Sequence, residues 1–114
     1  MERRLEQYLQ DISKALTELE QFIAGVSFEQ YRSNALLCRA VEREFTIIGE
    51  AVRQMEHHFP EVGDHLQHAR GITSFRNLIV HEYRHVDQSI VWDTAVNKTH
   101  ELRSQIEKWL DEVR

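Results

Sequence analysis

The hydrophobic positions of the chain recur at alternating spacings of three and four residues, the period of an amphipathic helix. A first stripe predicts a helix over about residues 2–24, and Gly25 is placed to end it. A second stripe predicts a helix over about residues 34–58, with Asn34 as the N-cap and Pro60 as the stop. Two long amphipathic helices therefore account for much of the chain.

The remaining pattern is also helical. A third helix is predicted over about residues 69–84, and Asp87 can cap a fourth that residues 97–99 interrupt. Ser27 and Gln30 have the spacing of a capping box. No stretch alternates polar and apolar residues as a strand does. The fold class is therefore all-α, a bundle of four to five helices, and the heptad-like stripes make a homodimer plausible.

Composition narrows the class of protein. The 114 residues suit one domain, 1–114, and the 41% of hydrophobic residues suits a packed core. One cysteine fits a reducing, cytoplasmic compartment, and Cys38 is expected to be a small packing residue. Gly49 lies among bulky residues, which predicts the close approach of another helix. No apolar run has the roughly 18 residues of a membrane span.

The net charge of −5 excludes a basic protein that covers nucleic acid through non-specific electrostatic attraction. Arginine nevertheless outnumbers lysine, by eleven to three, and its planar fork recognises phosphate. Three arginines and two histidines lie between Arg70 and His85, with Glu82 as the only acidic residue. The sequence thus favours a focused basic patch within an acidic protein.

One short motif in this patch is typical of zinc proteases. His81-Glu82-Tyr83-Arg84-His85 matches H-E-x-x-H, in which two histidines on one helix face bind zinc. The longer metzincin pattern fails, because Gln88 and Val91 stand where glycine and histidine are required. Four further histidines lack the spacing of metal ligands, and we expect them to lie on the solvent-exposed surface. They are His57, His58, His65 and His68. We therefore expect no metal and no other cofactor.

A second motif overlaps the first: Arg76 and His81 form R-x4-H-x-Y with Tyr83. A histidine can move a proton to or from ribose oxygens near neutral pH, and an arginine can hold the scissile phosphate. Asn77 can orient the histidine or bind a phosphate oxygen. Arg76 and His81 are about 140° apart around one helix, so a second copy of the helix would complete the cluster. The alternative is an ordinary polar helix face.

The motif and its surroundings resemble the HepT toxin family of the HEPN superfamily. The resemblance covers nearly the whole chain in order and rests on four stretches, namely FTIIGEAV (45–52), FRNLIVHEY (75–83), IVW (90–92) and HELRSQI (100–106). It implies an all-α HEPN domain and an endoribonuclease that is the toxin of a type VII-like toxin–antitoxin pair. HEPN ribonucleases carry R-x4-6-H with a polar residue after the arginine, here Asn77.

By this resemblance, Arg76, Asn77 and His81 form a catalytic site at a homodimer interface that cleaves RNA without metal. A partner of the minimal nucleotidyltransferase (MntA-like) type would inactivate the toxin by transferring AMP to Tyr83. Arg70 and Arg84 are candidate contacts to the RNA backbone. Some HEPN domains are not catalytic, so the alternative is a binding module that engages a nucleotidyltransferase partner.

Overall fold

The computed structural model describes residues 4–82 and 85–114, and this part of the chain is helical without strands. Its helices are α1 (Leu5–Ile23), α2 (Phe28–Arg32), α3 (Ala35–His58), α4 (Val62–His65), α5 (Ala69–His81), α6 (Gln88–Asn97) and α7 (His100–Val113). The all-α prediction is confirmed. The described residues hold more helices than the four to five expected, because α2 and α4 are too short for a hydrophobic period to reveal.

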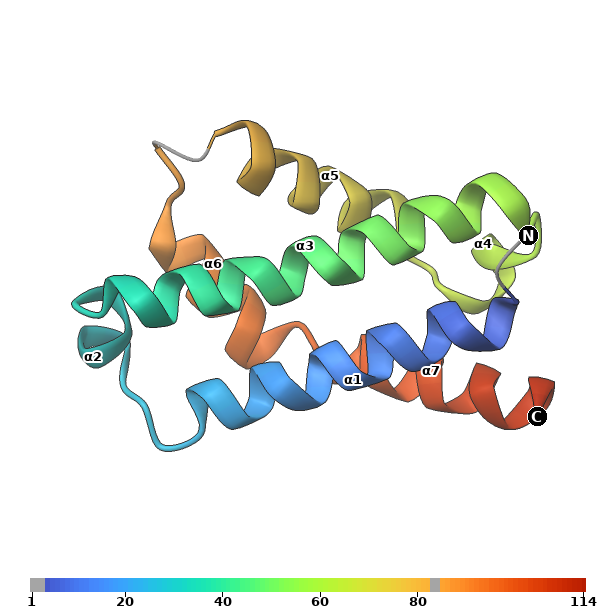
Figure 1. Cartoon of the computed structure of the whole chain (residues 1–114), viewed down its shortest axis with the longest axis horizontal. Coiled ribbons are helices and arrows are strands. Elements are labelled where there is room, and N and C mark those ends of the chain that lie inside the picture. Colours follow the sequence, from blue (N-terminus) through green and yellow to red (C-terminus); the bar gives the residue numbers. More distant parts are fainter. Residues whose placement is uncertain (1–3, 83–84) are drawn as a thin grey trace.

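The long helix α3 lies at the centre of the bundle (Figure 1). It packs against α1 on one side and α5 on the other, and α7 packs against α1. Both α1 and α5 run antiparallel to α3, while α6 crosses the bundle obliquely (Figure 1). The start of α1 and the end of α7 lie at the same end of the molecule. Within the described residues, no helix combines the length and apolarity that crossing a membrane requires.

The predicted end of the first helix, the start of the next and both ends of the second long helix are confirmed, whereas the first helix starts at Leu5 and not at about residue 2. Gly25 has a φ of 71°, the left-handed conformation with which many helices end. The side chain of Ser27 accepts a hydrogen bond from the backbone of Gln30, and the Gln30 side chain accepts one from the backbone of Ser27. Asn34 caps α3 by accepting a hydrogen bond of 3.0 Å from the backbone N–H of Leu37. Local sequence is sufficient to set these ends.

The third helix ends earlier than predicted. The stripe suggested about residues 69–84, but α5 ends at His81, where the backbone N–H of Glu82 closes the last turn on Leu78. Two long-range hydrogen bonds hold Gln88, at the start of α6, against α2 and α3. The chain must therefore leave the axis of α5 to reach that position, and this tertiary requirement overrides the helical pattern.

The core runs along both sides of α3, and Cys38 is buried in it as expected. The apolar residues along α5 are buried unequally. Ile79 is buried, whereas Ile72 and Phe75 are half-buried. The cause is that α5 packs mainly on α3 and stands away from the corner between α6 and α7.

Candidate active site

Arg76 lies on the side of α5 that faces α3, and its guanidinium is mostly buried. Its Nη2 is 2.8 Å from Oε2 of Glu50, and its Nη1 donates a hydrogen bond of 2.8 Å to Oδ1 of Asn77. The Nε atom is buried and has no hydrogen-bond partner among the described residues. Purely structural arginines normally satisfy their buried donors, so this side chain keeps donor capacity that the fold itself does not use.

A surface depression of about 390 Å³ is lined in part by Arg76. Its walls come from α1, α3 and α5, and it includes Arg43, Glu50 and Gln54 of α3. The depression also includes Asp11, so its two arginines are matched by two acidic side chains. A phosphate oxygen that enters it would meet Arg76 in a position fixed by Glu50, which is the placement that the predicted role of Arg76 requires.

His81 lies apart from this depression. It is the last residue of α5 and is exposed, and its side chain is not part of the Arg76 depression. The structure thus brings Arg76 and Asn77 together through a hydrogen bond, but it does not bring His81 to them within one chain. This agrees with the angular separation of about 140° expected from the helix period.

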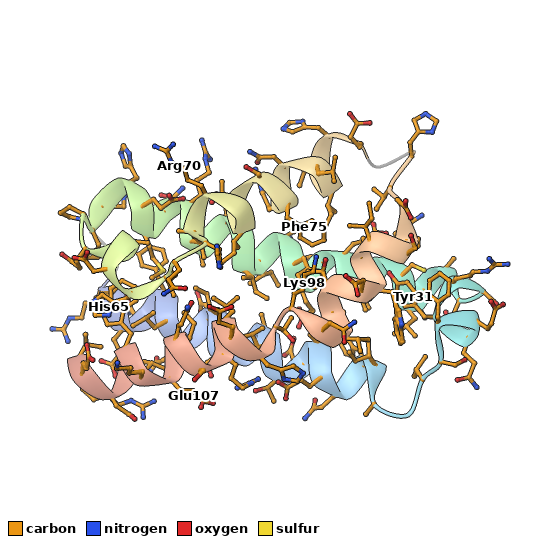
Figure 2. The ribbon with its side chains drawn as sticks, turned by 180° about the vertical axis from the view of Figure 1, so that it is seen from behind. Tyr31, His65, Arg70, Phe75, Lys98 and Glu107 are labelled. Atoms are coloured by element: carbon orange, nitrogen blue, oxygen red, sulfur yellow. The ribbon has the colours of Figure 1, made fainter. Side chains whose placement is uncertain are left out.

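Two of the predicted site residues, Tyr83 and Arg84, lie outside the described residues. Arg70 is exposed on the first turn of α5 (Figure 2). It borders a second depression, of about 650 Å³, together with Arg53 and His57 of α3. This depression meets the Arg76 depression at Gln54, which lines both. Sequence reasoning missed Arg43 and Arg53, because only the packing of α5 on α3 places them beside the motif.

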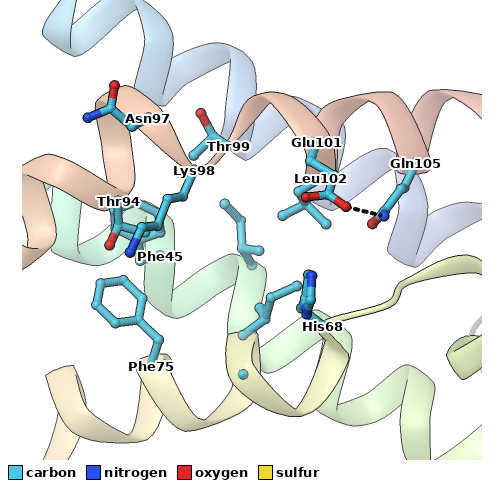
Figure 3. A pocket seen from close by; sticks show the side chains of 13 residues that line it. Phe45, His68, Phe75, Thr94, Asn97, Lys98, Thr99, Glu101, Leu102 and Gln105 are labelled. Carbon is cyan, nitrogen blue, oxygen red and sulfur yellow. Dashed lines mark hydrogen bonds between the residues drawn. The ribbon is translucent and has the colours of Figure 1, made fainter.

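An apolar pocket of about 390 Å³ lies on another side of α5, between α3 and the α6–α7 corner. Figure 3 shows Phe75 and Lys98 on facing walls, with His68 farther along. Arg70, Arg76, Asn77 and His81 are all absent from its lining. The pocket is the gap left where α5 stands away from α6 and α7, and it does not belong to the candidate site.

A polar network holds the start of α6, directly after the motif. Gln88 donates a hydrogen bond of 2.6 Å to Oε2 of Glu42 and accepts one from the hydroxyl of Tyr31. Arg39 donates to the same carboxylate at 2.7 Å. Burial raises the pKa of the Tyr31 hydroxyl, which keeps it protonated as a donor. No signal in the sequence links residues so far apart.

The zinc interpretation of H-E-x-x-H loses its geometric basis. Its two histidines share a face only if the helix continues through both, and α5 ends at His81. Among the described residues, there is no group of three or more histidine, cysteine, aspartate or glutamate side chains suited to hold a metal ion. His65 instead stacks on Trp109, with ring centroids 4.1 Å apart.

The chain is similar to known proteins over nearly its full length. The model of the family described as "Ribonuclease HepT-like" matches residues 12–109. This chain belongs to the HepT-like ribonuclease family. Membership places it among the hydrolases that cleave RNA, and it confirms the resemblance seen in the sequence.

Individual relatives agree with the family. A protein of Caldanaerobacter subterraneus subsp. tengcongensis, provisionally named an RNase, is 32% identical over 103 residues, which cover 90% of this chain and 91% of the relative. A similarly named protein of Methanocaldococcus jannaschii is 26% identical, covering 97% and 91%. A protein of Thermococcus cleftensis, provisionally named ribonuclease HepT, is 29% identical, covering 95% and 97%. No solved structure shows significant similarity to the chain.

Proposed function

We propose that the chain is the toxin of a prokaryotic toxin–antitoxin pair and that it cleaves cytoplasmic RNA with Arg76, Asn77 and His81. The observation that carries the proposal is the half-buried Arg76 of the R-x4-H motif, held beside Asn77 at a surface depression. This guanidinium stabilises charge on the oxygens of the scissile phosphate. His81 is exposed, as a group that exchanges protons with RNA must be.

The reaction needs no metal. His81 either takes the proton of a ribose 2′-OH, whose oxygen attacks the adjacent phosphorus, or gives a proton to the 5′-oxygen that leaves. In the complete reaction, one bond forms between the 2′-oxygen and phosphorus and one breaks between phosphorus and the 5′-oxygen, and water accepts or donates the second proton. Oδ1 of Asn77 accepts a hydrogen bond from Arg76, and the side-chain N–H groups of Asn77 donate to a phosphate oxygen. Arg70 and Arg84 contact the RNA backbone.

The working form is a homodimer in which two copies of α5 meet. Arg76 faces α3 while His81 is exposed, so a composite site combines residues of two chains. Two further observations support this surface: Leu78 and Val80 are exposed by 46% and 36%, respectively, on the last turns of α5. Contact with a second chain would remove these two apolar side chains from water.

The antitoxin is a minimal nucleotidyltransferase that attaches AMP to Tyr83. Support comes from position: Tyr83 follows His81 by two residues, so a modified side chain stays close to the histidine. Each AMP adds bulk and a negative phosphate, which obstruct the site and repel the RNA backbone.

One observation favours the alternative function, a binding module that engages a nucleotidyltransferase without cleaving RNA. Within a single chain, Arg76 and His81 belong to different surfaces. If no second copy completes the site, the chain retains the fold and the partner surface but no catalytic pair.

Cleavage of RNA by purified, unmodified protein tests the proposal. We expect the wild type to cut RNA and to arrest bacterial growth, and His81→Ala to do neither while folding normally. A chelator should leave cleavage intact, because the mechanism uses no metal. A folded, unmodified wild type that is as inactive as His81→Ala would refute the ribonuclease and favour the binding module.

The modification of Tyr83 has its own test. The intact mass of the protein should rise by AMP increments after incubation with the partner and ATP, and Tyr83→Phe should abolish these increments.

A further inference from the structure

Arg76 occupies the space that a side chain at Gly49 would fill. A Cβ built on Gly49 would lie 2.1 Å from Cβ and 2.6 Å from Cγ of Arg76, and 3.4 Å from the carbonyl oxygen of Ile72. Real carbon atoms do not approach so closely. Because Cβ of Arg76 is fixed to the backbone of α5, rotation of the guanidinium cannot relieve the contact. Any side chain at Gly49 must therefore push α5 away from α3.

The next residue holds the other end of the same side chain. Oε2 of Glu50 lies 2.8 Å from Nη2 of Arg76, although the two groups are not aligned as a hydrogen bond. The side chain of Arg76 is 19% exposed, so the charge of Glu50 acts in a partly water-excluded position. Oε1 of Glu50 also lies 3.9 Å from Nη1 of Arg53. A carboxylate shared by two arginines fixes the direction of the more buried one.

We propose that Gly49 and Glu50 are positioning residues for Arg76 in RNA cleavage, an inference that rests on the proposed function. Gly49 sets how deeply the arginine is seated against α3, and Glu50 sets where its guanidinium points. An arginine stabilises a transition state less well when its guanidinium can rotate between several positions, because the reacting geometry tolerates only small displacements. Neither residue touches the RNA. Their effect reaches the reaction through Arg76.

Two substitutions away from Arg76 supply matched controls. Glu20 of α1 also contacts an arginine of a neighbouring helix, where its Oε1 accepts a hydrogen bond of 2.7 Å from Nε of Arg103 in α7. Gly71 of α5 is helical like Gly49, but a Cβ there would meet no atom within 4 Å among the described residues. Glu20→Gln and Gly71→Ala therefore repeat the two chemical changes without altering the surroundings of Arg76.

The test compares Glu50→Gln and Gly49→Ala with these two controls in steady-state cleavage of one RNA. We expect kcat to fall about tenfold or more in both test variants, since a charged contact to Arg76 or its seating is lost. In Glu50→Gln, KM should stay within about twofold. The controls should cleave like the wild type. Glu50→Gln that cleaves as fast as the wild type, or faster, would overturn the proposal by showing that Glu50 is dispensable or competes with the phosphate.

A second measurement separates this inference from the ribonuclease itself. The Nε–Hε resonance of Arg76 in the RNA-free protein, assigned by its loss in Arg76→Lys, reports the immobilised guanidinium. We expect it to shift or broaden in Glu50→Gln and Gly49→Ala and to stay in place in the controls. An unchanged resonance in both test variants would refute the positioning role even if the protein cleaves RNA. If wild type and His81→Ala both fail to cleave, the proposed function falls, and an altered resonance still establishes how Arg76 is held.

Discussion

Gln88, the first residue of α6, donates a hydrogen bond of 2.6 Å from Nε2 to the buried carboxylate of Glu42 in α3. Its own Oε1 accepts from the hydroxyl of Tyr31, and the ring of Tyr31 lies against Trp92 with centroids 4.9 Å apart. This network therefore fixes the point at which the chain returns to the bundle after the R-x4-H motif.

Replacing Gln88 by alanine should lower the free energy of unfolding by about 1–3 kcal/mol. The change removes the hydrogen-bond acceptor of the Tyr31 hydroxyl. It also removes one donor to the buried carboxylate of Glu42, which keeps its hydrogen bond from Arg39. Urea denaturation at neutral pH measures the loss. Asn97→Ala is the control, because the side chain of Asn97 donates to the exposed Asp93. Similar losses in both variants would contradict the idea that burial makes the Gln88 network costly to break.

The end of α1, the start of α2 and both ends of α3 could be predicted because each depends on residues only a few positions apart. The capping box of Ser27 with Gln30 and the cap of Asn34 on Leu37 are of this kind. The end of α5 could not be predicted, since it depends on where Gln88 is held by Glu42, 46 residues away in sequence. Local patterns carry no information on such a partner.

Some features of the candidate site could likewise be predicted from local sequence, and others could not. Sequence singled out Gly49 as a point of close helix approach, which the structure confirms. It also singled out Arg76 from its motif, and the catalytic role of Arg76 stays a prediction. What sequence could not provide is that Gly49 accommodates Arg76 itself, and that Glu50 and Arg43 stand beside it. The angular separation of Arg76 from His81, by contrast, could be predicted from the helix period alone.

The buried carboxyl of Glu44 should make stability depend on pH. Burial first, and then a hydrogen bond and repulsion from Glu18, raise the pKa of Glu44 to about 7 from its ordinary 4.5. Between these values the folded protein binds more protons than the unfolded chain, so stability falls as pH rises through this range. Glu44→Gln should therefore stabilise the fold by about 2 kcal/mol at pH 8 and less at pH 4.

Denaturation midpoints of wild type and Glu44→Gln at both pH values check this expectation. Glu29→Gln serves as the control, because the side chain of Glu29 is largely exposed. The control should shift both midpoints little. If Glu44→Gln destabilises the protein at pH 8, the carboxylate is stabilising in its charged form, and the expected direction is wrong.

Two glycines with open space around them should respond to alanine in opposite directions. A Cβ at Gly25 or at Gly71 would have no described atom within 4 Å, but Gly25 has a φ of 71° and Gly71 is helical. Gly25→Ala should lower the free energy of unfolding by about 1 kcal/mol through backbone strain alone. Gly71→Ala should raise the free energy of unfolding by as much as about 1 kcal/mol. Thermal unfolding of both variants measures the difference. A stabilising Gly25→Ala would show that the loop after α1 can relax to a negative φ.

Mixing two inactive variants should restore cleavage if the site combines Arg76 of one chain with His81 of the other. In a heterodimer of Arg76→Ala and His81→Ala chains, one of the two sites receives both native residues. Random exchange makes half of the dimers mixed, so the mixture should reach about a quarter of wild-type activity. Each variant incubated alone provides the baseline, and native mass spectrometry confirms that mixed dimers form. If mixed dimers form and activity stays at baseline, Arg76 and His81 do not act together across the interface, and the composite site is excluded.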